Sequence, residues 1–286
     1  MVTVVPSIAE EPDETCQDNL AFGGDVRDGE RMTTTPEIIT SAQNPTIKSV
    51  RALDQKKHRQ ETGLFVAEGV RALERARAAG IAPEMVLSVT GPQAWGQARD
   101  IRVSEAVMAR LSAQNNPSGL IGVFRQSDFL SPFDQKADIA IALEDIRDPG
   151  NLGTIIRTAD AVGVRHVVLV GESCDPFSPE AVRASMGSLF GVTLTRLATA
   201  KFTAVLDEWP GEIIATAADA RSDFRRVYQR PTLLLMGSEG AGLSAELAAK
   251  ANVAVRIPMP GQAESLNVAT ASALLLYEIK RPELKI

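Results

Sequence analysis

Residues 256–280, RIPMPGQAESLNVATASALLLYEIK, decide the fold that we assign to this chain. The β-branched run that ends at Ile257 is typical of a strand. Pro258 and Pro260 must stop that strand, because proline cannot donate a hydrogen bond to a neighbouring strand. Gly261 then permits a tight turn. The stretch therefore indicates a strand end and a sharp turn before a long helix.

The helix is expected to begin at Glu264 or Ser265, and it is apolar on nearly every side. Such a helix is usually buried on more than one side. Polar groups at its buried start need hydrogen-bond partners. Two interpretations stay open at this point. Ser265 and Asn267 cap the helix, or the turn lines a ligand site and presents Asn267 to a substrate.

The composition is that of a globular protein with room for two domains: 286 residues, 44% hydrophobic and 23% charged. The net charge of -6 at first argues against a nucleic-acid partner. Residues 1–35, however, hold eight acidic and two basic residues, which leaves 28 bases and 28 acids in a neutral body. We expect residues 1–35 to form a disordered acidic extension.

Cysteine and histidine are scarce, with two of each. Cys16 and Cys174 lie far apart in the chain, so we expect no Cys/His metal site. Low cysteine use suits a cytoplasmic protein. A secretory signal and an apolar stretch of about 18 residues are both missing, so we expect a soluble protein with no membrane contact.

The body of the chain divides into two predicted domains. Residues 36–130 show mixed helix and strand patterns, and one basic helix that ends at Gly63 opens them. Ser131–Asp134 forms a short linker. In residues 134–286, strands near 138–143, 165–171, 192–197, 212–217, 231–236 and 252–257 alternate with helices. This order predicts an α/β fold with a mostly parallel sheet, whose ligands bind at the carboxyl ends of the strands.

Two further loops follow strands of that sheet. In residues 144–164, EDIRDPGNLGTIIRTADAVGV, Asn151 is a good helix N-cap and Arg157 follows on the helix. The plain alternative is a capped helix with Arg157 paired to Asp160 or Glu144. The functional alternative places Asn151 and Arg157 over a pocket, where arginine suits a phosphate.

Residues 233–244, LLLMGSEGAGLS, form the second loop. They contain neither the dinucleotide pattern GxGxxG nor the phosphate-loop pattern GxxxxGK[ST]. The loop is either a simple turn or a place where the backbone approaches a ligand closely.

Together the three stretches resemble, in order and spacing, the three motifs of the SpoU-type (TrmH-like) branch of the SPOUT RNA methyltransferases. The stretches NPTIKSVRAL (44–53) and GLFVAEGVRAL (63–73) resemble the small RNA-binding domain of ribosomal-RNA members. The resemblance implies a parallel sheet with a C-terminal deep trefoil knot, a small L30e-like N-terminal domain and a homodimer. It also implies S-adenosyl-L-methionine as cofactor and a 2′-O-methylated ribose as product.

The motif match carries over site residues one by one. The implied catalytic positions are Asn151, Arg157, Glu239, Ser265 and Asn267. The implied cofactor-binding positions are Thr216, Ala217, Gly237, Ser238, Ile257, Met259 and Leu266. From charge alone, the predicted RNA contacts are Lys48, Arg51, Lys56, Lys57 and Arg59.

Four functions are weighed. A 2′-O-methyltransferase acting on 23S ribosomal RNA is the preferred prediction, and a tRNA enzyme of the same class is the first alternative. A non-catalytic RNA-binding protein on the same scaffold is the second, which the intact polar motif positions oppose. An oxidoreductase is disfavoured because GxGxxG is missing.

Overall fold

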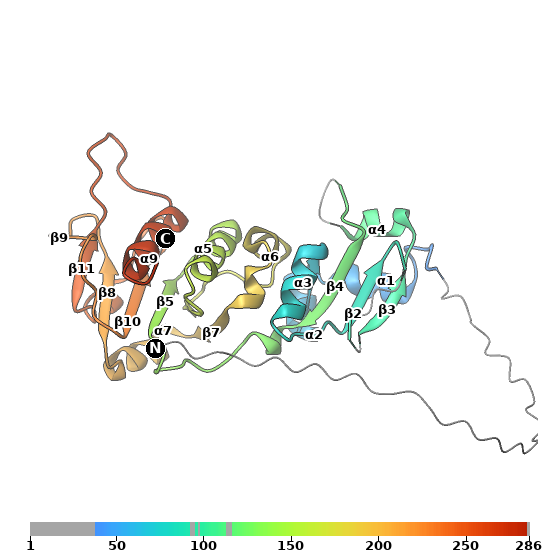
Figure 1. The fold of residues 1–286 in the computed structure, drawn as a ribbon, viewed down its shortest axis with the longest axis horizontal. Helices are drawn as coiled ribbons and strands as arrows, with labels where there is room; N and C mark the ends of the chain where they lie inside the picture. Colours follow the sequence, from blue (N-terminus) through green and yellow to red (C-terminus); the bar gives the residue numbers. More distant parts are fainter. Residues whose placement is uncertain (1–37, 92–94, 97, 113–115, 285–286) are drawn as a thin grey trace, which may run out of the picture. The chain divides into compact units, whose positions relative to one another are not determined.

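A seven-stranded sheet forms the C-terminal part of the protein (Figure 1). The structure, a computed structural model, describes residues 38–91, 95–96, 98–112 and 116–284, so the predicted acidic extension lies outside the described residues. The strand order is β7-β6-β5-β10-β8-β11-β9, and every neighbouring pair is parallel. The strands are β5 (Ile139–Glu144), β6 (His166–Val170), β7 (Thr193–Leu197), β8 (Glu212–Thr216), β9 (Ser222–Asp223), β10 (Thr232–Met236) and β11 (Val253–Arg256). The predicted parallel α/β sheet is therefore confirmed; the two-residue β9 was not predicted.

Helices cover both faces of this sheet because its strands alternate apolar side chains between two cores. Ile141 of β5 belongs to the core beneath α5, α6 and α9, whereas its neighbour Ala142 belongs to the core beneath α7 and α8. The helices are α5 (Pro149–Ala161), α6 (Pro179–Ser185), α7 (Thr199–Glu208), α8 (Ala245–Ala248) and α9 (Val268–Lys280).

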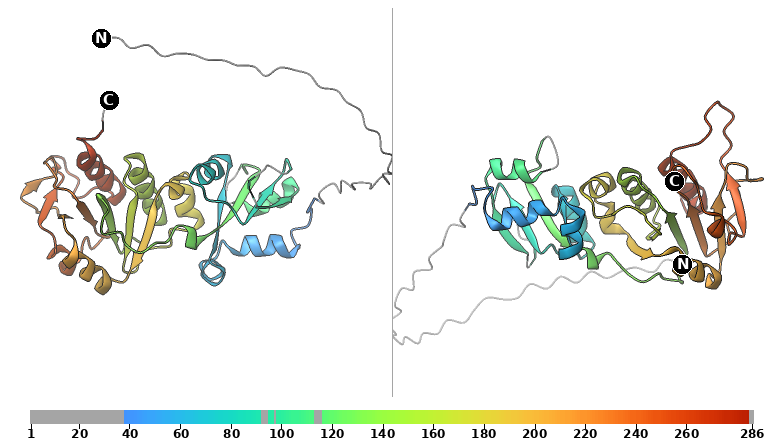
Figure 2. Two further views of the ribbon diagram at one scale, coloured as in Figure 1. Left: turned by 60° about the horizontal axis from the view of Figure 1, so that its bottom comes forward. Right: turned by 180° about the vertical axis from the view of Figure 1, so that it is seen from behind.

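The N-terminal part is a four-stranded mixed sheet in the order β1-β4-β2-β3. Its strands are β1 (Leu64–Glu68), β2 (Met85–Ser88), β3 (Arg99–Arg102) and β4 (Leu120–Arg125), and its helices are α1 (Pro45–Ala52), α2 (Lys56–Thr62), α3 (Val70–Ala78) and α4 (Glu105–Leu111). Figure 2 shows both sheets with their helices from two further directions.

One expected basic helix is in fact two. The N–H groups of Leu53, Asp54 and Gln55 donate to carbonyls three residues back, at 3.1, 3.2 and 3.0 Å, and this tight turn ends α1. Leu53, in this turn, is buried in the core. As predicted, Gly63 ends α2, in the left-handed region at φ 67°.

The last helix begins later than predicted, at Val268, because Asn267 rather than Glu264 or Ser265 caps it. One part of its surface faces solvent, where Leu274 and Tyr277 are 40% and 51% exposed. A long loop joins β11 to α9 and runs out from the sheet (Figure 1). Among the described residues, none of the helices has the length and apolar character needed to cross a membrane.

Candidate active site

A cavity of about 510 Å³ opens at the carboxyl ends of the adjacent strands β10, β8 and β11. This is the sheet edge at which ligands of parallel sheets bind. The cavity brings together all the residues predicted for the cofactor, namely Thr216, Ala217, Gly237, Ser238, Ile257, Met259 and Leu266. Three of the predicted catalytic residues, Glu239, Ser265 and Asn267, line it as well.

The loop after β10 can fold over the cavity only because position 237 is glycine. A Cβ atom on Gly237 would lie 2.0 Å from the backbone of Gly242 and Leu243. Ser238 and Gly242 exchange backbone hydrogen bonds of 3.0 and 3.1 Å, which close the loop. Gly242 itself has φ 70°, a conformation that side chains disfavour. The glycines therefore permit a tight turn that faces the cavity.

The chemistry of the cavity fits an adenosine group. Val255 and Leu275 supply buried apolar walls. The backbone N–H groups of Ile257, Met259 and Leu266 donate no hydrogen bond within the described part of the chain. Apolar surface for the ring, with unpaired main-chain donors for its edge, is the usual pattern of a nucleoside site.

A chain of side-chain hydrogen bonds connects the three motifs. Asn267 Nδ2 donates to Asn151 Oδ1 at 2.9 Å, and Asn151 Nδ2 donates to Glu239 Oε1 at 3.0 Å. The backbone N–H groups of Arg147 and Asp148 approach the same carboxylate at 3.4 Å. Three segments far apart in sequence thus meet beside the cavity.

The Glu239 carboxylate is stabilised in its charged form. Burial desolvates it and by itself would raise its pKa. The Asn151 side chain and the backbone N–H groups of Glu239, Arg147 and Asp148 outweigh that effect by hydrogen bonding, so the pKa of Glu239 lies below its ordinary value of 4.5. Glu239 is therefore ionised at neutral pH and is a weak base.

Asn151 does not cap α5 as predicted. The cap is Asp148, whose Oδ1 accepts from the backbone N–H of Asn151 at 2.7 Å. Asn151 is the third residue of the helix, in its first turn, which leaves its side chain available to Glu239. Gly153 lets α5 approach α6 closely, because a Cβ there would lie 2.4 Å from the carbonyl oxygen of Ala181.

Arg157 lies apart from the cavity. It is six positions after Asn151, about 9 Å further along α5 at 1.5 Å per residue, and it is exposed. Its two predicted structural partners are engaged elsewhere, since Asp160 pairs with Arg75 and Glu144 accepts from the backbone of Ser244. Within the described residues the Arg157 side chain makes no hydrogen bond or ion pair.

Ser265 is exposed, lines the cavity and caps nothing, so only Asn267 serves as the cap. The prediction overlooked Arg256 and Glu264, two charged residues that also line the cavity. Both are adjacent in sequence to predicted cavity residues, and that proximity was the available signal. The described residues contain no group of three or more side chains suited to hold a metal.

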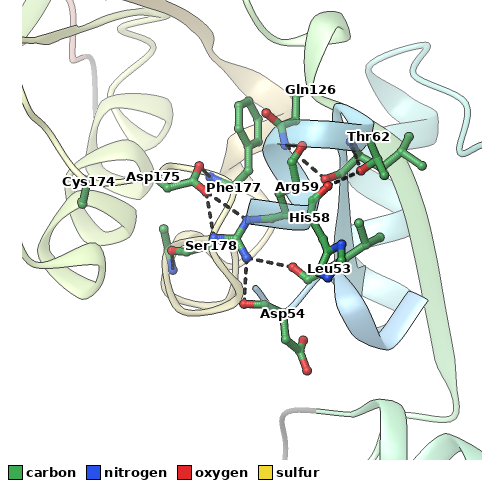
Figure 3. Close-up of polar contacts among 12 residues, drawn as sticks. Leu53, Asp54, His58, Arg59, Thr62, Gln126, Cys174, Asp175, Phe177 and Ser178 are labelled. Carbon is green, nitrogen blue, oxygen red and sulfur yellow. Dashed lines mark hydrogen bonds and ion pairs between the residues drawn. The ribbon is translucent and has the colours of Figure 1, made fainter. Parts of the chain in front are cut away.

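The predicted RNA contacts divide into two groups. Lys48 and Arg51 on α1, and Lys56 and Lys57 on α2, are exposed. Arg59 is only 3% exposed and its guanidinium is held by Asp175 (Figure 3). Including Arg59 among surface RNA contacts was therefore wrong, because its donors are used inside the protein.

Family models match both parts of the chain. The SpoU rRNA Methylase family matches residues 138–277, and the MRM3-like substrate binding domain matches residues 44–122. The 23S rRNA (guanosine(2553)-2′-O)-methyltransferase RlmP of Bacillus subtilis is 30% identical over 85% of this chain and 98% of its own. The tRNA (guanosine(18)-2′-O)-methyltransferase of Escherichia coli is 38% identical, over 51% of this chain and 65% of its own.

A solved structure agrees with these matches. The AdoMet-bound rRNA methyltransferase from Sinorhizobium meliloti superposes with a TM-score of 0.80 at 39% identity, covering 87% of this chain and 99% of that one. Agreement in sequence extends over both parts of the chain, and so does agreement in fold. The chain belongs to the SpoU rRNA methylase family of RNA methyltransferases.

Proposed function

We propose that the protein transfers the methyl group of S-adenosylmethionine to a ribose 2′-hydroxyl of 23S ribosomal RNA. The observation that carries this function is the hydrogen-bond chain from Asn267 through Asn151 to Glu239, set beside the cavity of about 510 Å³. The match to the Bacillus rRNA enzyme covers 85% of the chain, against 51% for the tRNA enzyme, which favours ribosomal RNA. We also propose a cytoplasmic location, which a ribosomal-RNA substrate supports.

The residues of the site mainly position the reacting groups. The cofactor supplies an already activated methyl on a sulfonium, so the protein needs to align the 2′-hydroxyl and help remove its proton. Glu239 accepts from Asn151 and has a lowered pKa. It therefore acts as the anchor that orients Asn151 and Asn267, and a water molecule takes the proton. Ser265, with its exposed hydroxyl at the cavity, contacts the nucleotide.

Arg157 acts on the RNA rather than as a base, because a guanidinium stays protonated in proteins. Its exposed position without a described partner suits a phosphate beside the target ribose, with stabilisation of the developing alkoxide. Since it lies outside the cavity of its own chain, Arg157 acts where two protomers meet.

The active form proposed is a homodimer that covers the exposed face of α9. Leu274 and Tyr277, three positions apart on α9, are 40% and 51% exposed, so this helix presents two large neighbouring apolar side chains to solvent. Introducing charge by Tyr277→Asp should give monomers in sedimentation. A dimer that survives Leu274→Asp and Tyr277→Asp together would refute this face.

The finer fold follows the family as well. We assign RNA binding to residues 36–130, with an L30e-like fold, and methyl transfer to residues 134–286. A deep trefoil knot is supported by the return of α9, after its long loop, onto α5. The RNA backbone lies along Lys48, Arg51, Lys56 and Lys57. Neutralising these four should flatten the salt dependence of RNA affinity, whereas Arg59 should contribute nothing to that slope.

The decisive experiment measures labelled methyl transfer from S-adenosylmethionine to unmodified 23S rRNA and tRNA transcripts. Wild type should protect one position of 23S rRNA from alkaline cleavage, and Arg157→Ala should lower turnover by about 100- to 1000-fold. Label in tRNA alone would show that tRNA, and not 23S rRNA, is the substrate. Cofactor binding without methyl transfer to any RNA would exclude protein-free transcripts as substrates. Absence of both cofactor binding and methyl transfer would favour a non-catalytic RNA-binding protein.

A further inference from the structure

Arg59 joins the N-terminal and C-terminal parts of the chain by a buried set of contacts (Figure 3). Its Nε donates to Asp175 Oδ2 at 2.9 Å, and its Nη2 lies 2.8 Å from the same oxygen. Its Nη1 donates to the carbonyls of Leu53 and Asp54 at 2.8 and 2.9 Å. The side chains of Arg59 and Asp175 are 4% and 10% exposed.

Both ends of this pair are held in place by their own surroundings. Asp175 Oδ1 accepts from the backbone N–H of Phe177 at 2.9 Å, which orients the carboxylate within the loop before α6. The two carbonyls that Arg59 contacts end α1, so the guanidinium also fixes the turn between α1 and α2. A buried pair adds little net stability, but its planar donors demand one geometry.

Aromatic rings fill the seam beside this pair. Phe65 and Phe124 come from the small sheet, Phe177 and Phe190 from the methyltransferase part, and Phe129 from the connection between them. Ring centroids are 4.9 Å apart for Phe65 and Phe177, and again for Phe124 and Phe190. All five rings are less than 5% exposed, so the core runs without a break between the two sheets.

The connecting segment is also tied down. Leu194 of β7 donates its N–H to the carbonyl of Phe129 at 2.9 Å and accepts from Ser131 at 3.0 Å. The Thr195 hydroxyl donates to the carbonyl of Ser131 at 3.0 Å. A segment paired to a strand in this way cannot act as a free hinge.

We infer that Arg59 is a positioning residue that fixes the RNA-binding part at one orientation to the cavity. This inference rests on the proposed function. A fixed orientation sets a fixed distance between the cavity and RNA bound on α1 and α2. Only a ribose at that distance from the bound segment then reaches the site. The aromatic core holds the two parts together, and the Arg59–Asp175 pair sets the angle between them.

The test compares Arg59→Met with wild type on the 23S rRNA transcript, at a temperature where circular dichroism shows both folded. The variant should raise KM for the transcript about tenfold, leave cofactor affinity unchanged, and spread methylation to nucleotides near the wild-type target. Arg59→Lys should restore part of the selectivity, because it keeps the charge but not the four-way contact.

A matched control removes a similar pair away from the seam. Arg226 Nη1 lies 2.7 Å from Glu212 within the methyltransferase part, and the Glu212 side chain is 8% exposed. Arg226→Met should lower stability yet leave the methylated position and KM as in wild type. Equal loss of selectivity in Arg226→Met and Arg59→Met, or a single wild-type target in Arg59→Met, would overturn the positioning role.

A second readout needs no RNA. Spin labels at Ser49→Cys and Lys201→Cys, in a chain with Cys16→Ser and Cys174→Ser diluted with unlabelled protein, report the distance between the two parts. A narrow distribution of spin-label distances that broadens on Arg59→Met supports the fixed orientation. A broad distribution in the parent chain refutes it. If wild type methylates no RNA, the proposed function fails. The distance measurement still shows whether Arg59 fixes the orientation of the two parts.

Discussion

Asn267 performs two tasks that substitution can separate. Its Oδ1 accepts from the backbone N–H groups of Ala269 and Thr270 at 2.8 and 3.3 Å, which caps α9. Its Nδ2 donates to Asn151 at 2.9 Å. Asn267→Ala removes both contacts. Asn267→Ser keeps a capping oxygen but no donor that reaches Asn151.

The magnitudes differ for the two tasks. Loss of an N-cap costs about 1 kcal/mol of unfolding free energy, whereas a serine cap is nearly equivalent to asparagine. The bond to Asn151 is exposed, so its loss costs no more than about 1 kcal/mol. Activity should respond more strongly, because displacing a positioned group by about 1 Å can lower turnover about 100-fold. We therefore expect Asn267→Ala to lose stability and turnover, and Asn267→Ser to lose mainly turnover.

Urea unfolding and methyl transfer at saturating cofactor measure the two effects. Ser104→Ala is the control, since it removes the cap of α4, where Ser104 Oγ accepts from Val107 at 3.3 Å. It should cost similar stability and leave turnover unchanged. Wild-type turnover in Asn267→Ser would refute the functional role of the hydrogen-bond chain, and equal unfolding free energies for the two Asn267 variants would refute the capping role.

Three further predictions concern neighbouring residues. Gly153→Ala should cost about 1–3 kcal/mol in urea unfolding and lower turnover, because its methyl would meet Ala181 and push α5 from α6. The lowered pKa of Glu239 contributes stability that is present above pH 4.5 and is lost as pH falls below that value, so Glu239→Gln should flatten the acid limb of unfolding free energy against pH. Burial, followed by the charges of Glu239, Asp148 and Asp175, raises the pKa of Cys174 to about 11, so iodoacetamide should alkylate it slowly at neutral pH and faster as pH approaches that value.

Local patterns predicted most of the sheet, because a buried strand is apolar in its own sequence. Ile139–Glu144 and Thr232–Met236 are continuous apolar or nearly apolar runs, and both proved to be central parallel strands. The end of α2 at Gly63 was predictable for the same reason. A left-handed backbone conformation favours glycine at that one position, whatever the rest of the chain does. Such features need no knowledge of distant parts of the chain.

Features that depend on distant partners were not predictable in this way. Arg59 looked like one of a run of surface cations, yet its carboxylate partner lies 116 positions later in the chain. The cap of α5 is a local case that also failed, because Asp148 and Asn151 are both good caps and Pro149 favours the earlier one by fitting the first helical position. The contact between Asn151 and Asn267 again spans 116 positions.

Two features of the methyltransferase part fit the proposed homodimer. The last helix is apolar on nearly every side, yet it leaves Leu274 and Tyr277 exposed. The motif arginine, Arg157, has neither a partner nor a place in the cavity among the described residues. An apolar face that a single chain does not cover needs a second surface, and a second protomer would supply one. The same pairing would bring Arg157 to a site that its own chain does not complete. If Arg157→Ala chains mixed with Asn267→Ala chains recovered turnover that neither has alone, the shared site would follow directly, and no recovery after verified subunit exchange would place Arg157 at its own cavity.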